Sequence, residues 1–400
     1  MRERGVLVIG GGMAGMSAAI EAAEAGSDVY IVERSPTLGG RVAQLHQYFP
    51  KLCPPYCGLE INYRRIKGDH RHFKVFTLAE VEEITGQAGD YDVSVRLDPR
   101  FVIMDRCIAC NRCAEVCPVE RPNDFNYGLD TTKAAYLPGA MAFPMKYVID
   151  PVACRGTACA ACVDACPTEA IDLSMETRRI NLKVGSIVLA TGWRPYDANR
   201  LSILGYAEHS DVITNVQMER LAAVDGPTGG RIVRPSDGRE AKRVAFVQCA
   251  GSRDLNHLPY CSSICCLGSI KEATYVRSQY PDSKVTIFYI DIRAPGTNED
   301  FYHRIRADEG VAFVKGKVAK VTWDGATGDL VVEADDMLSG GKTRTAVDLV
   351  VLATGMVPVT ADHQIPGLSV TYDEYGFAIE NRDAGVFVAG VAHRPADVVT

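Results

Sequence analysis

Two runs of cysteines constrain the folding of this chain more than any other feature of its sequence. The first run reads Cys107-x2-Cys110-x2-Cys113-x3-Cys117-Pro118. The second reads Cys154-x4-Cys159-x2-Cys162-x3-Cys166-Pro167, and its last three cysteines are offset from those of the first run by 49 residues. The two runs are therefore an internal repeat of one metal-binding unit.

The repeat predicts two [4Fe-4S] clusters with crossed ligand sets. Three thiolates on a short loop hold three irons of one cubane, and the cysteine before proline, on the helix that follows, reaches across to the other cluster. Cluster one then takes Cys107, Cys110, Cys113 and Cys166. Cluster two takes Cys154, Cys159, Cys162 and Cys117, and the x4 spacing lengthens its loop. Structural zinc is the alternative, since zinc also binds four thiolates, but the doubled run with its prolines favours cubanes.

Composition narrows the class of protein. The chain has 400 residues, fourteen of them cysteine, and in a reducing cytosol cysteines in such number indicate metal binding or redox chemistry rather than disulfides. A net charge of -7 argues against nucleic acid as a partner. Every apolar run is broken before the roughly 18 to 20 residues that a membrane span needs, and the amino end lacks a secretory signal. We therefore expect a cytoplasmic protein with no direct membrane span.

The amino-terminal segment carries a dinucleotide-binding fingerprint. A strand over 6–9 runs into Gly10-Gly11-Gly12-Met13-Ala14-Gly15, a helix over 16–25 follows, and a second strand over 28–32 ends on Glu33. Gly10 allows the tight turn, Gly12 lets the backbone approach a pyrophosphate at the helix amino terminus, and Gly15 allows close packing of helix on strand. Glu33 is placed to bind a ribose hydroxyl.

Further segments indicate that the dinucleotide is FAD. The stretch Glu33-Arg34-Ser35-Pro36-Thr37-Leu38-Gly39-Gly40-Arg41 resembles the segment with which two-domain flavoproteins make a second approach to the diphosphate. Two apolar strands, 187–189 and 349–352, run into Ala-Thr-Gly. They look like the two segments by which the chain of such flavoproteins passes back from one domain to the other. Residues 385–390 resemble the last FAD strand, with Val391 where an acid is usual. The expected contacts are completed by Val81, Thr191, Gly192, Gly390 and Val391.

A second Rossmann-like unit has lost its expected phosphate loop. Strands are predicted over 244–248 and 284–290, with a helix over 264–279 between them. The turn where a pyridine-nucleotide reductase is glycine-rich carries cysteine instead. Four thiolates, Cys249-x11-Cys261-x3-Cys265-Cys266, suffice for one more [4Fe-4S] cluster beside the flavin; zinc or free redox thiols are the alternatives.

Taken together, the fingerprint, the segment 39–45, the inserted double cluster and the motif Tyr260-Cys261-x3-Cys265-Cys266 resemble the family of heterodisulfide reductase A subunits, which are iron–sulfur flavoproteins, over nearly the whole chain. The resemblance implies FAD, a third cluster on Cys249, Cys261, Cys265 and Cys266, and no nicotinamide site. Segment 49–62 is most similar to the A subunit of the quinone-interacting membrane-bound oxidoreductase of sulfate reducers.

This narrower resemblance implies the partners and the location. The partners are adenylylsulfate reductase, a membrane haem-containing subunit that reacts with quinone, and a sister iron–sulfur flavoprotein subunit. The chain would then be attached peripherally to the inner membrane through a partner. It ends at Val398-Val399-Thr400, where such flavoproteins begin a helix that approaches the flavin, so we expect a truncation or a neighbouring subunit that completes the site.

Cys53 and Cys57 remain outside these sets. They fit a redox pair near the flavin, ligands lent to a partner's cluster, or buried thiols. The linker over 120–150 fits either a cover over the clusters or a partner, or else a mobile surface loop.

The expected fold is α/β, a two-domain FAD-dependent disulfide-reductase-like flavoprotein with an inserted ferredoxin. We expect an FAD domain in segments 1–100, 181–240 and 346–400, the insert at 101–180, and the second Rossmann-like domain at 241–345. No acid, base or nucleophile motif suggests a catalytic side chain. The predicted function is electron transfer between FAD and three [4Fe-4S] clusters, between membrane quinol and adenylylsulfate reductase. The rivals are a self-contained NAD(P)H-dependent reductase and a purely structural subunit.

Overall fold

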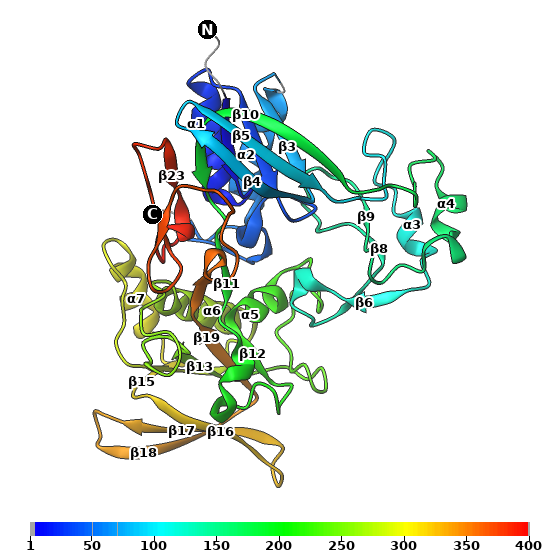
Figure 1. Ribbon diagram of the computed structural model, residues 1–400. Coiled ribbons are helices and arrows are strands. Elements are labelled where there is room, and N and C mark those ends of the chain that lie inside the picture. Colours follow the sequence, from blue (N-terminus) through cyan, green and yellow to red (C-terminus); the bar gives the residue numbers. More distant parts are fainter. Residues whose placement is uncertain (1–4, 50, 70, 399–400) are drawn as a thin grey trace.

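The computed structural model describes residues 5–49, 51–69 and 71–398, arranged as two sheet-based units with a lobe that projects to one side (Figure 1). Residues 1–4, Pro50, His70 and 399–400 lie outside the described residues. The expectations for the first four residues and for the last two therefore concern parts of the chain that are not described, as does Pro50 of the segment 49–62.

A seven-stranded sheet forms the first unit. Its strands run in the order β3-β2-β1-β10-β5-β4, and β23 pairs with β10. The strands are β1 (Gly5–Ile9), β2 (Val29–Glu33), β3 (Phe73–Thr77), β4 (Ala79–Gln87), β5 (Asp90–Leu97), β10 (Arg178–Leu189) and β23 (Val386–Val388). β1 lies parallel to β2 and β10, and its nearly continuous apolar sequence suits a strand covered on both faces.

Two helices cover one face of this sheet. They are α1 (Met13–Glu24) and α2 (Tyr56–Gly68). α1 buries Met16, Ala19, Ile20 and Ala23, which recur at helical spacing, against Val8 and Ile31 of the sheet. Packing of this apolar face fixes the amino end of α1 at the carboxyl edge of β1.

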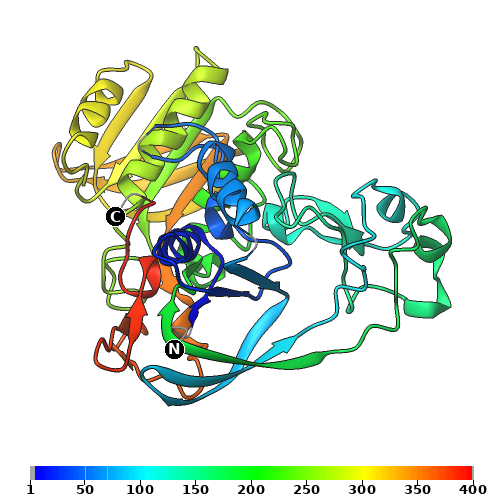
Figure 2. The same cartoon turned by 90° about the horizontal axis from the view of Figure 1, so that it is seen from above.

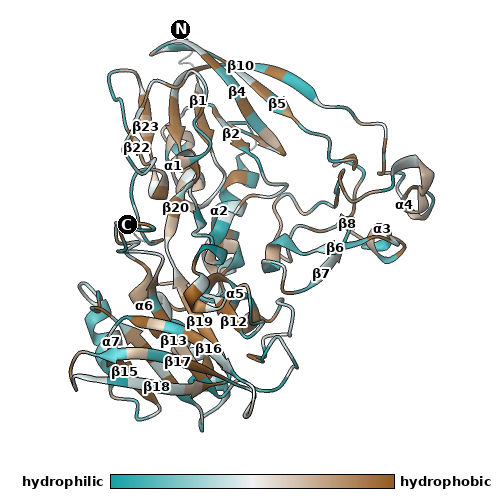
Figure 3. Cartoon of the chain, turned by 60° about the horizontal axis from the view of Figure 1, so that its bottom comes forward, coloured by the Kyte–Doolittle hydropathy of each residue, from teal (hydrophilic) through white to brown (hydrophobic). Residues whose placement is uncertain are grey.

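The second unit is built on a five-stranded parallel sheet in the order β12-β19-β13-β14-β15. Its strands are β12 (Val212–Thr214), β13 (Arg243–Ala250), β14 (Lys284–Tyr289), β15 (Val311–Lys315) and β19 (Leu349–Thr354), and its helices are α5 (Asn215–Ala222), α6 (Cys265–Gln279) and α7 (Asn298–Arg306). Every residue of β19 is buried, and the strand is among the most hydrophobic in Figure 3. The predicted strands and helix of this unit are present, with slightly different ends.

A three-stranded antiparallel sheet, β16 (Val318–Asp324), β17 (Asp329–Asp336) and β18 (Gly341–Val347), lies at the far end of the second unit (Figure 1). It packs Val321, Leu330 and Val332 against the core of the parallel sheet. The sequence patterns did not distinguish this sheet from the unit that contains it.

Two chain segments connect the units. β11 (Trp193–Pro195) and β20 (Met356–Pro358) follow the two Ala-Thr-Gly turns and pair antiparallel. A short hairpin, β21 (Thr371–Tyr372) with β22 (Ala378–Ile379), precedes β23. The cavity described below lies where these connections cross.

The lobe contains both ferredoxin-like cysteine runs. Its elements are α3 (Arg112–Glu115), α4 (Ala161–Ala165), β6 (Glu120–Pro122), β7 (Thr131–Lys133), β8 (Ala135–Tyr136) and β9 (Val148–Ile149). Figure 2 shows it standing away from both units at the end of long strands. At its base the buried Arg100 donates to the carbonyl of Pro36 at 2.5 Å and to the Thr77 hydroxyl at 2.8 Å. No helix in the described residues is long and apolar enough to cross a membrane.

The linker 120–150 packs on the first unit and does not form a loose surface loop. The Arg41 guanidinium donates to the Tyr127 hydroxyl at 2.9 Å, and the backbone N–H of Phe143 donates to the Thr37 hydroxyl at 2.8 Å. Arg220 of the second unit donates to the Asn126 side chain at 2.8 Å. The linker thus joins the ferredoxin-like lobe to both other units.

Candidate functional site

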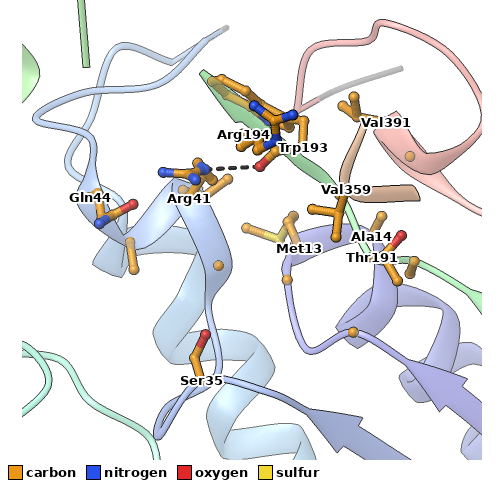
Figure 4. A pocket seen from close by; sticks show the side chains of 18 of the residues that line it. Met13, Ala14, Ser35, Arg41, Gln44, Thr191, Trp193, Arg194, Val359 and Val391 are labelled. Atoms are coloured by element: carbon orange, nitrogen blue, oxygen red, sulfur yellow. Dashed lines mark hydrogen bonds between the residues drawn. The ribbon is translucent and has the colours of Figure 1, made fainter. Parts of the chain in front are cut away.

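A cavity of about 970 Å³ lies between the two sheet units. The amino end of α1, the end of β2, the segment 34–45 and the 3₁₀ turn Gly390–Ala392 form its first wall, and α5 and α6 contribute to the opposite wall. Figure 4 shows Met13, Ala14, Thr191 and Val391 gathered around it. Predicted FAD residues that line the cavity are Gly10, Gly12, Met13, Ala14, Glu33, Arg34, Gly40, Arg41, Val81, Thr191, Gly192, Gly390 and Val391.

Gly15 and Gly39, the other two predicted FAD residues, do not line the cavity. A Cβ on Gly15 would lie 1.9 Å from the Gly10 carbonyl oxygen, so glycine is required there for the close approach of α1 to β1. Gly39 adopts a φ of 109° and forms a bridge with Gly12. Both glycines therefore shape the turn that borders the cavity.

Gly12 differs from its neighbours because the protein leaves room for a side chain there. Its φ is -74°, and a Cβ at this position would meet no atom nearer than the Gly40 Cα at 3.9 Å. Gly12 is the N-cap residue of α1 and has no side chain that could accept a hydrogen bond from the helix. The first N–H groups of α1 therefore face the cavity without a side-chain acceptor from Gly12. A helix start of this kind binds phosphate, and a bound diphosphate explains why the position is glycine.

Glu33 lies at the end of β2 and connects two parts of the cavity wall. Its carboxylate accepts hydrogen bonds from the N–H of Gly11 at 2.6 Å and from the N–H of Ser35 at 2.7 Å. The side chain is thereby held beside the glycine turn, at the edge of the cavity where a ribose is expected.

Arg41 joins three segments at the cavity. Its Nε donates to the Trp193 carbonyl at 3.0 Å (Figure 4), while the guanidinium also lies 5.6 Å from the Tyr127 ring and 5.5 Å from the Trp193 ring. These contacts connect the FAD segment, the β11 crossover and the linker from the lobe. Trp193 and Tyr127 were not among the predicted site residues, because no local pattern relates them to Arg41.

In the lobe, Cys117, Cys154, Cys159 and Cys162 line one small cavity of about 20 Å³. These four are the crossed set predicted for cluster two. Cys117 belongs to the first run and the other three to the second, so only folding of the repeat brings them together. The donor set is four thiols around a common space, which is the ligand chemistry of a cubane.

Three of the four cysteines predicted for cluster one lie in the apolar core of the lobe. Cys107, Cys113 and Cys166 contribute to one hydrophobic cluster that also contains Cys117, Cys154 and Cys162 of the other set, and Cys110 is exposed. Burial, then the neighbouring charge of Cys107, raises the pKa of Cys113 to about 12. Cys166 accepts a hydrogen bond from the N–H of Ala170 at 3.2 Å, of the kind that tunes a cluster sulfur.

The position of the bridging cysteines differs from the expectation. We expected each to lie on the helix that follows its loop, but Cys117 and Cys166 lie just beyond the ends of α3 and α4. Each short helix instead contains the third cysteine of its run, Cys113 or Cys162, because the proline after the fourth cysteine disfavours helical structure at the residue before it.

The third cysteine set is assembled at the start of α6. Cys265 and Cys266 are its first two residues, Cys249 is the second-last residue of β13 with a φ of 55°, and Cys261 lies in the loop between. Burial raises the pKa of Cys265 well above its usual value, and the charges of Cys249, Cys266 and Cys261 add to this effect. Ser263, Ile264, Leu267 and Gly268, which are interleaved with the set, line the large cavity.

No group of three or more His, Cys, Asp or Glu side chains within 5–49, 51–69 and 71–398 is arranged to hold a metal ion. A cubane attaches each thiolate to a different iron, so its ligands surround a volume. The thiol chemistry and the shared space in the lobe fit such a group.

Cys53 and Cys57 lie at the start of α2. Cys57 is exposed, Cys53 is half-buried, and a hydrogen bond with Cys53 raises the pKa of Cys57. The backbone N–H of Tyr48, a residue that lines the cavity, donates to the Cys53 carbonyl at 3.2 Å. The pair is thus close to the cavity, and its three possible roles remain open.

Comparison with known proteins agrees with this geometry. Residues 5–71 match the FAD dependent oxidoreductase family, and residues 101–120 match the 4Fe-4S binding domain. Over 99% of its length the chain is 40% identical to the A subunit of the Ferredoxin/F(420)H(2)-dependent CoB-CoM heterodisulfide reductase of Methanosarcina acetivorans. It is 39% identical, over 98% of its length, to the second iron-sulfur A subunit of the CoB--CoM heterodisulfide reductase of Methanopyrus kandleri.

The chain is a homologue of the heterodisulfide reductase A subunits. It covers 51% of the Methanosarcina protein and 61% of the Methanopyrus protein, so it spans about half to three-fifths of the length of these curated relatives. Its matches to the FAD dependent oxidoreductase family and to the 4Fe-4S binding domain agree with the FAD and cluster sites predicted from the sequence.

Solved structures confirm the fold of this heterodisulfide reductase A homologue. Thioredoxin reductase of Lactococcus lactis aligns with 99% of the chain and 93% of its own at a TM-score of 0.52 and 14% identity. Thioredoxin reductase of T. acidophilum aligns with 99% of the chain and 92% of its own at a TM-score of 0.51 and 15% identity. The predicted two-domain flavoprotein fold with a ferredoxin insert is confirmed.

Proposed function

We propose that the chain is the electron-transfer subunit of a multi-subunit redox complex, with FAD in the large cavity and three [4Fe-4S] clusters. Two clusters are held in the lobe by the crossed cysteine sets, and the third by Cys249, Cys261, Cys265 and Cys266. When bound, the flavin exchanges electron pairs and each cluster exchanges single electrons, so the chain converts one kind of transfer into the other.

The observation that carries this proposal is the position of the third cysteine set. It occupies the start of α6, and the residues interleaved with it line the cavity. A nicotinamide-dependent relative would carry a glycine-rich loop after the strand that corresponds to β13, whereas this chain carries cysteines there, directly behind the cavity-lining residues. Single electrons therefore have a donor or acceptor at the place where hydride would arrive.

The chain's own residues bind and orient the cofactor. The first N–H groups of α1 and the turn around Gly40 would hold the diphosphate, and Glu33 would bind the ribose. Arg41 fixes the linker from the lobe against the same wall through Tyr127, so the lobe's attachment and the cofactor site share one residue. Gly390 and Val391 line the cavity beside the amino end of α1, because a Cβ on Gly390 would lie 2.7 Å from the Ala14 Cβ.

The finer assignment follows the similarity of segment 49–62. We propose electron flow between membrane quinol and adenylylsulfate reductase, and the partners would be a sister iron–sulfur flavoprotein and a membrane haem-containing subunit. The chain would then be cytoplasmic and attached to the inner membrane through a partner. The domain limits given above stay a proposal, with the FAD domain in three segments and both inserts within one flavoprotein. The second unit also contains β12, α5 and β19, so its limits reach beyond 241–345 on both sides.

A test separates this function from that of an NAD(P)H-dependent reductase. NADH or NADPH, added without oxygen to the FAD- and cluster-loaded chain, should leave the flavin absorbance unchanged, while a reduced ferredoxin should bleach it. Stopped-flow absorbance measures both reactions. Rapid bleaching by either nicotinamide would overturn the proposal, because it would show a hydride site where the third cysteine set stands.

A further inference from the structure

Three charged or ionisable side chains are buried together in the cavity wall that belongs to the second unit. Glu219 on α5 is 3% exposed, and Lys271 and Glu272 on α6 are 5% and 1% exposed. All three line the cavity, and α5 packs against α6. None was singled out from the sequence, and neither cofactor binding nor the cysteine sets account for them.

Both oxygens of the Glu219 side chain have polar partners. Its Oε1 lies 2.9 Å from the ammonium of Lys271, and its Oε2 accepts a hydrogen bond from the N–H of His46 at 2.8 Å. The hydroxyl of Tyr275 donates to the same carboxylate at 3.3 Å. Lys271 also donates to the Gln47 carbonyl at 2.6 Å, so its ammonium group is held beside Glu219.

Glu272 has no comparable set of partners. Its Oε2 is buried and makes no hydrogen bond within the described structure. The charged groups around it leave one carboxyl charge unbalanced: Arg220 is paired with Asp225 at 3.0 Å, and burial lowers the pKa of His46, so the imidazole is neutral at pH 7. Lys271 neutralises one carboxylate of the two. An uncompensated carboxylate in this setting is strongly unfavourable.

The electrostatics of the site agree with a neutral Glu272. Burial raises its pKa well above the usual value, and the charge of Glu219 and a hydrogen bond to Glu219 raise it further, against the opposite effect of Lys271. The pKa of Tyr275 is also shifted upward, by burial and by Glu219, and the phenol stays protonated. Cys265 lies two helical turns away, and the charge of Glu272 contributes to the raised pKa of this thiol. The raised pKa of Glu272 therefore favours its neutral form.

A flavin reduced through iron–sulfur clusters needs such a proton. Hydride from a nicotinamide brings its own hydrogen nucleus, but two electrons that arrive singly from clusters bring none. Conversion of oxidised flavin to its singly protonated reduced form then requires two electrons and one proton. The electrons come from the [4Fe-4S] clusters, and the proton has to come from the protein or from water.

We propose that Glu272 is kept as a neutral carboxylic acid in the cavity wall and supplies the proton that accompanies reduction of the flavin by the clusters. This inference rests on the proposed function. The O–H bond of Glu272 breaks and a bond from that hydrogen to a flavin nitrogen forms, which leaves a carboxylate that water then reprotonates. Oxidation of the flavin runs the same exchange in reverse.

The first test measures the proton itself, without reference to turnover. Infrared spectra of the chain in H₂O and D₂O, with and without FAD, should show a carboxylic acid C=O band at pH 7 that shifts on deuteration. The band should be absent from Glu272→Gln and present in Glu309→Gln, whose side chain is exposed. A Glu272→Asp chain should keep an acid band at a changed frequency. A spectrum of Glu272→Gln identical to that of the unmodified chain would overturn the proposal.

The second test measures flavin reduction by dithionite-reduced clusters. Glu272→Gln should slow it about 100-fold, the lower range for loss of a general acid, with partial recovery in Glu272→Asp and no change in Glu309→Gln. Reduction of Glu272→Gln at the unmodified rate would contradict the role in proton supply. Failure of the chain to bind FAD would defeat the proposed function, and the infrared band of the FAD-free chain would still decide whether Glu272 is protonated.

Discussion

Replacement of Cys265 by alanine should remove one whole cluster and leave the flavin and both lobe clusters in place. The thiol is buried at the start of α6 beside the other three cysteines of the third set, and a cubane that loses one of four thiolates in a buried site loses its main anchorage. Iron analysis should show a loss of about four irons per chain. Transfer between flavin and the lobe clusters should slow by orders of magnitude in stopped-flow traces.

Cys57→Ala is the matched control for this variant. Cys57 is exposed and lies outside the three cysteine sets, so its removal should leave the iron content unchanged. Retention of all iron by Cys265→Ala, or a loss of four irons from Cys57→Ala alone, would show that the third cluster has other ligands.

Gly12→Val should produce a folded chain that does not hold FAD. The protein leaves space for a Cβ at this position and its φ is negative, so we expect the added side chain to collide with a bound ligand and not with the fold. A clash that costs about 3 kcal/mol weakens binding by about 100-fold. The thermal unfolding of the FAD-free chain should change little, since valine in place of glycine at a helix cap costs at most about 1 kcal/mol.

Two further glycines serve as controls for Gly12→Val. Gly68→Val alters an exposed helix end with open space around it and should leave FAD affinity unchanged. Gly15→Ala should instead destabilise the FAD-free chain itself, because its Cβ meets the Gly10 carbonyl. Calorimetric titration with FAD and unfolding curves distinguish the two behaviours. Tight FAD binding by Gly12→Val would refute the assigned position of the diphosphate.

Local patterns were sufficient to predict the first unit and much of its site. The glycine turn, the acid at the end of β2 and the Gly39-Gly40 doublet depend on backbone geometry that a few adjacent residues determine, and most of them line the cavity. The crossed set of Cys117 with Cys154, Cys159 and Cys162 also follows from the repeat alone, because two copies of one motif related by pseudo-symmetry exchange their fourth ligand.

Local sequence patterns could not predict contacts between segments that are distant in the sequence. Arg41, Tyr127 and Trp193 meet at the cavity although 152 residues separate the donor Arg41 from the carbonyl of Trp193. The linker 120–150 could not be placed, because its aromatic residues have no periodicity and find their partners in other units. The same holds for Glu219 and Glu272, since helix burial of charged residues becomes visible only when α5 and α6 pack.

One retrospective signal was present for α6. Its first residues are cysteines of the third set, and Lys271-Glu272 follow in a helix otherwise rich in small and apolar residues. Charged residues on a helix that begins at a proposed cluster could have been predicted to line the cofactor cavity. Their buried state, however, depends on α5 and on the segment 46–49, which contact them only in the folded chain.

The presence of one flavin and three clusters on a single chain is tested most directly by anaerobic quantitation of iron, acid-labile sulfide and FAD in the purified protein. We predict about twelve irons, about twelve sulfides and one FAD per chain, four irons for each of three cubanes. About eight irons with one FAD would contradict this prediction, because the third cysteine set would then hold no cluster and the cavity would lack its single-electron partner.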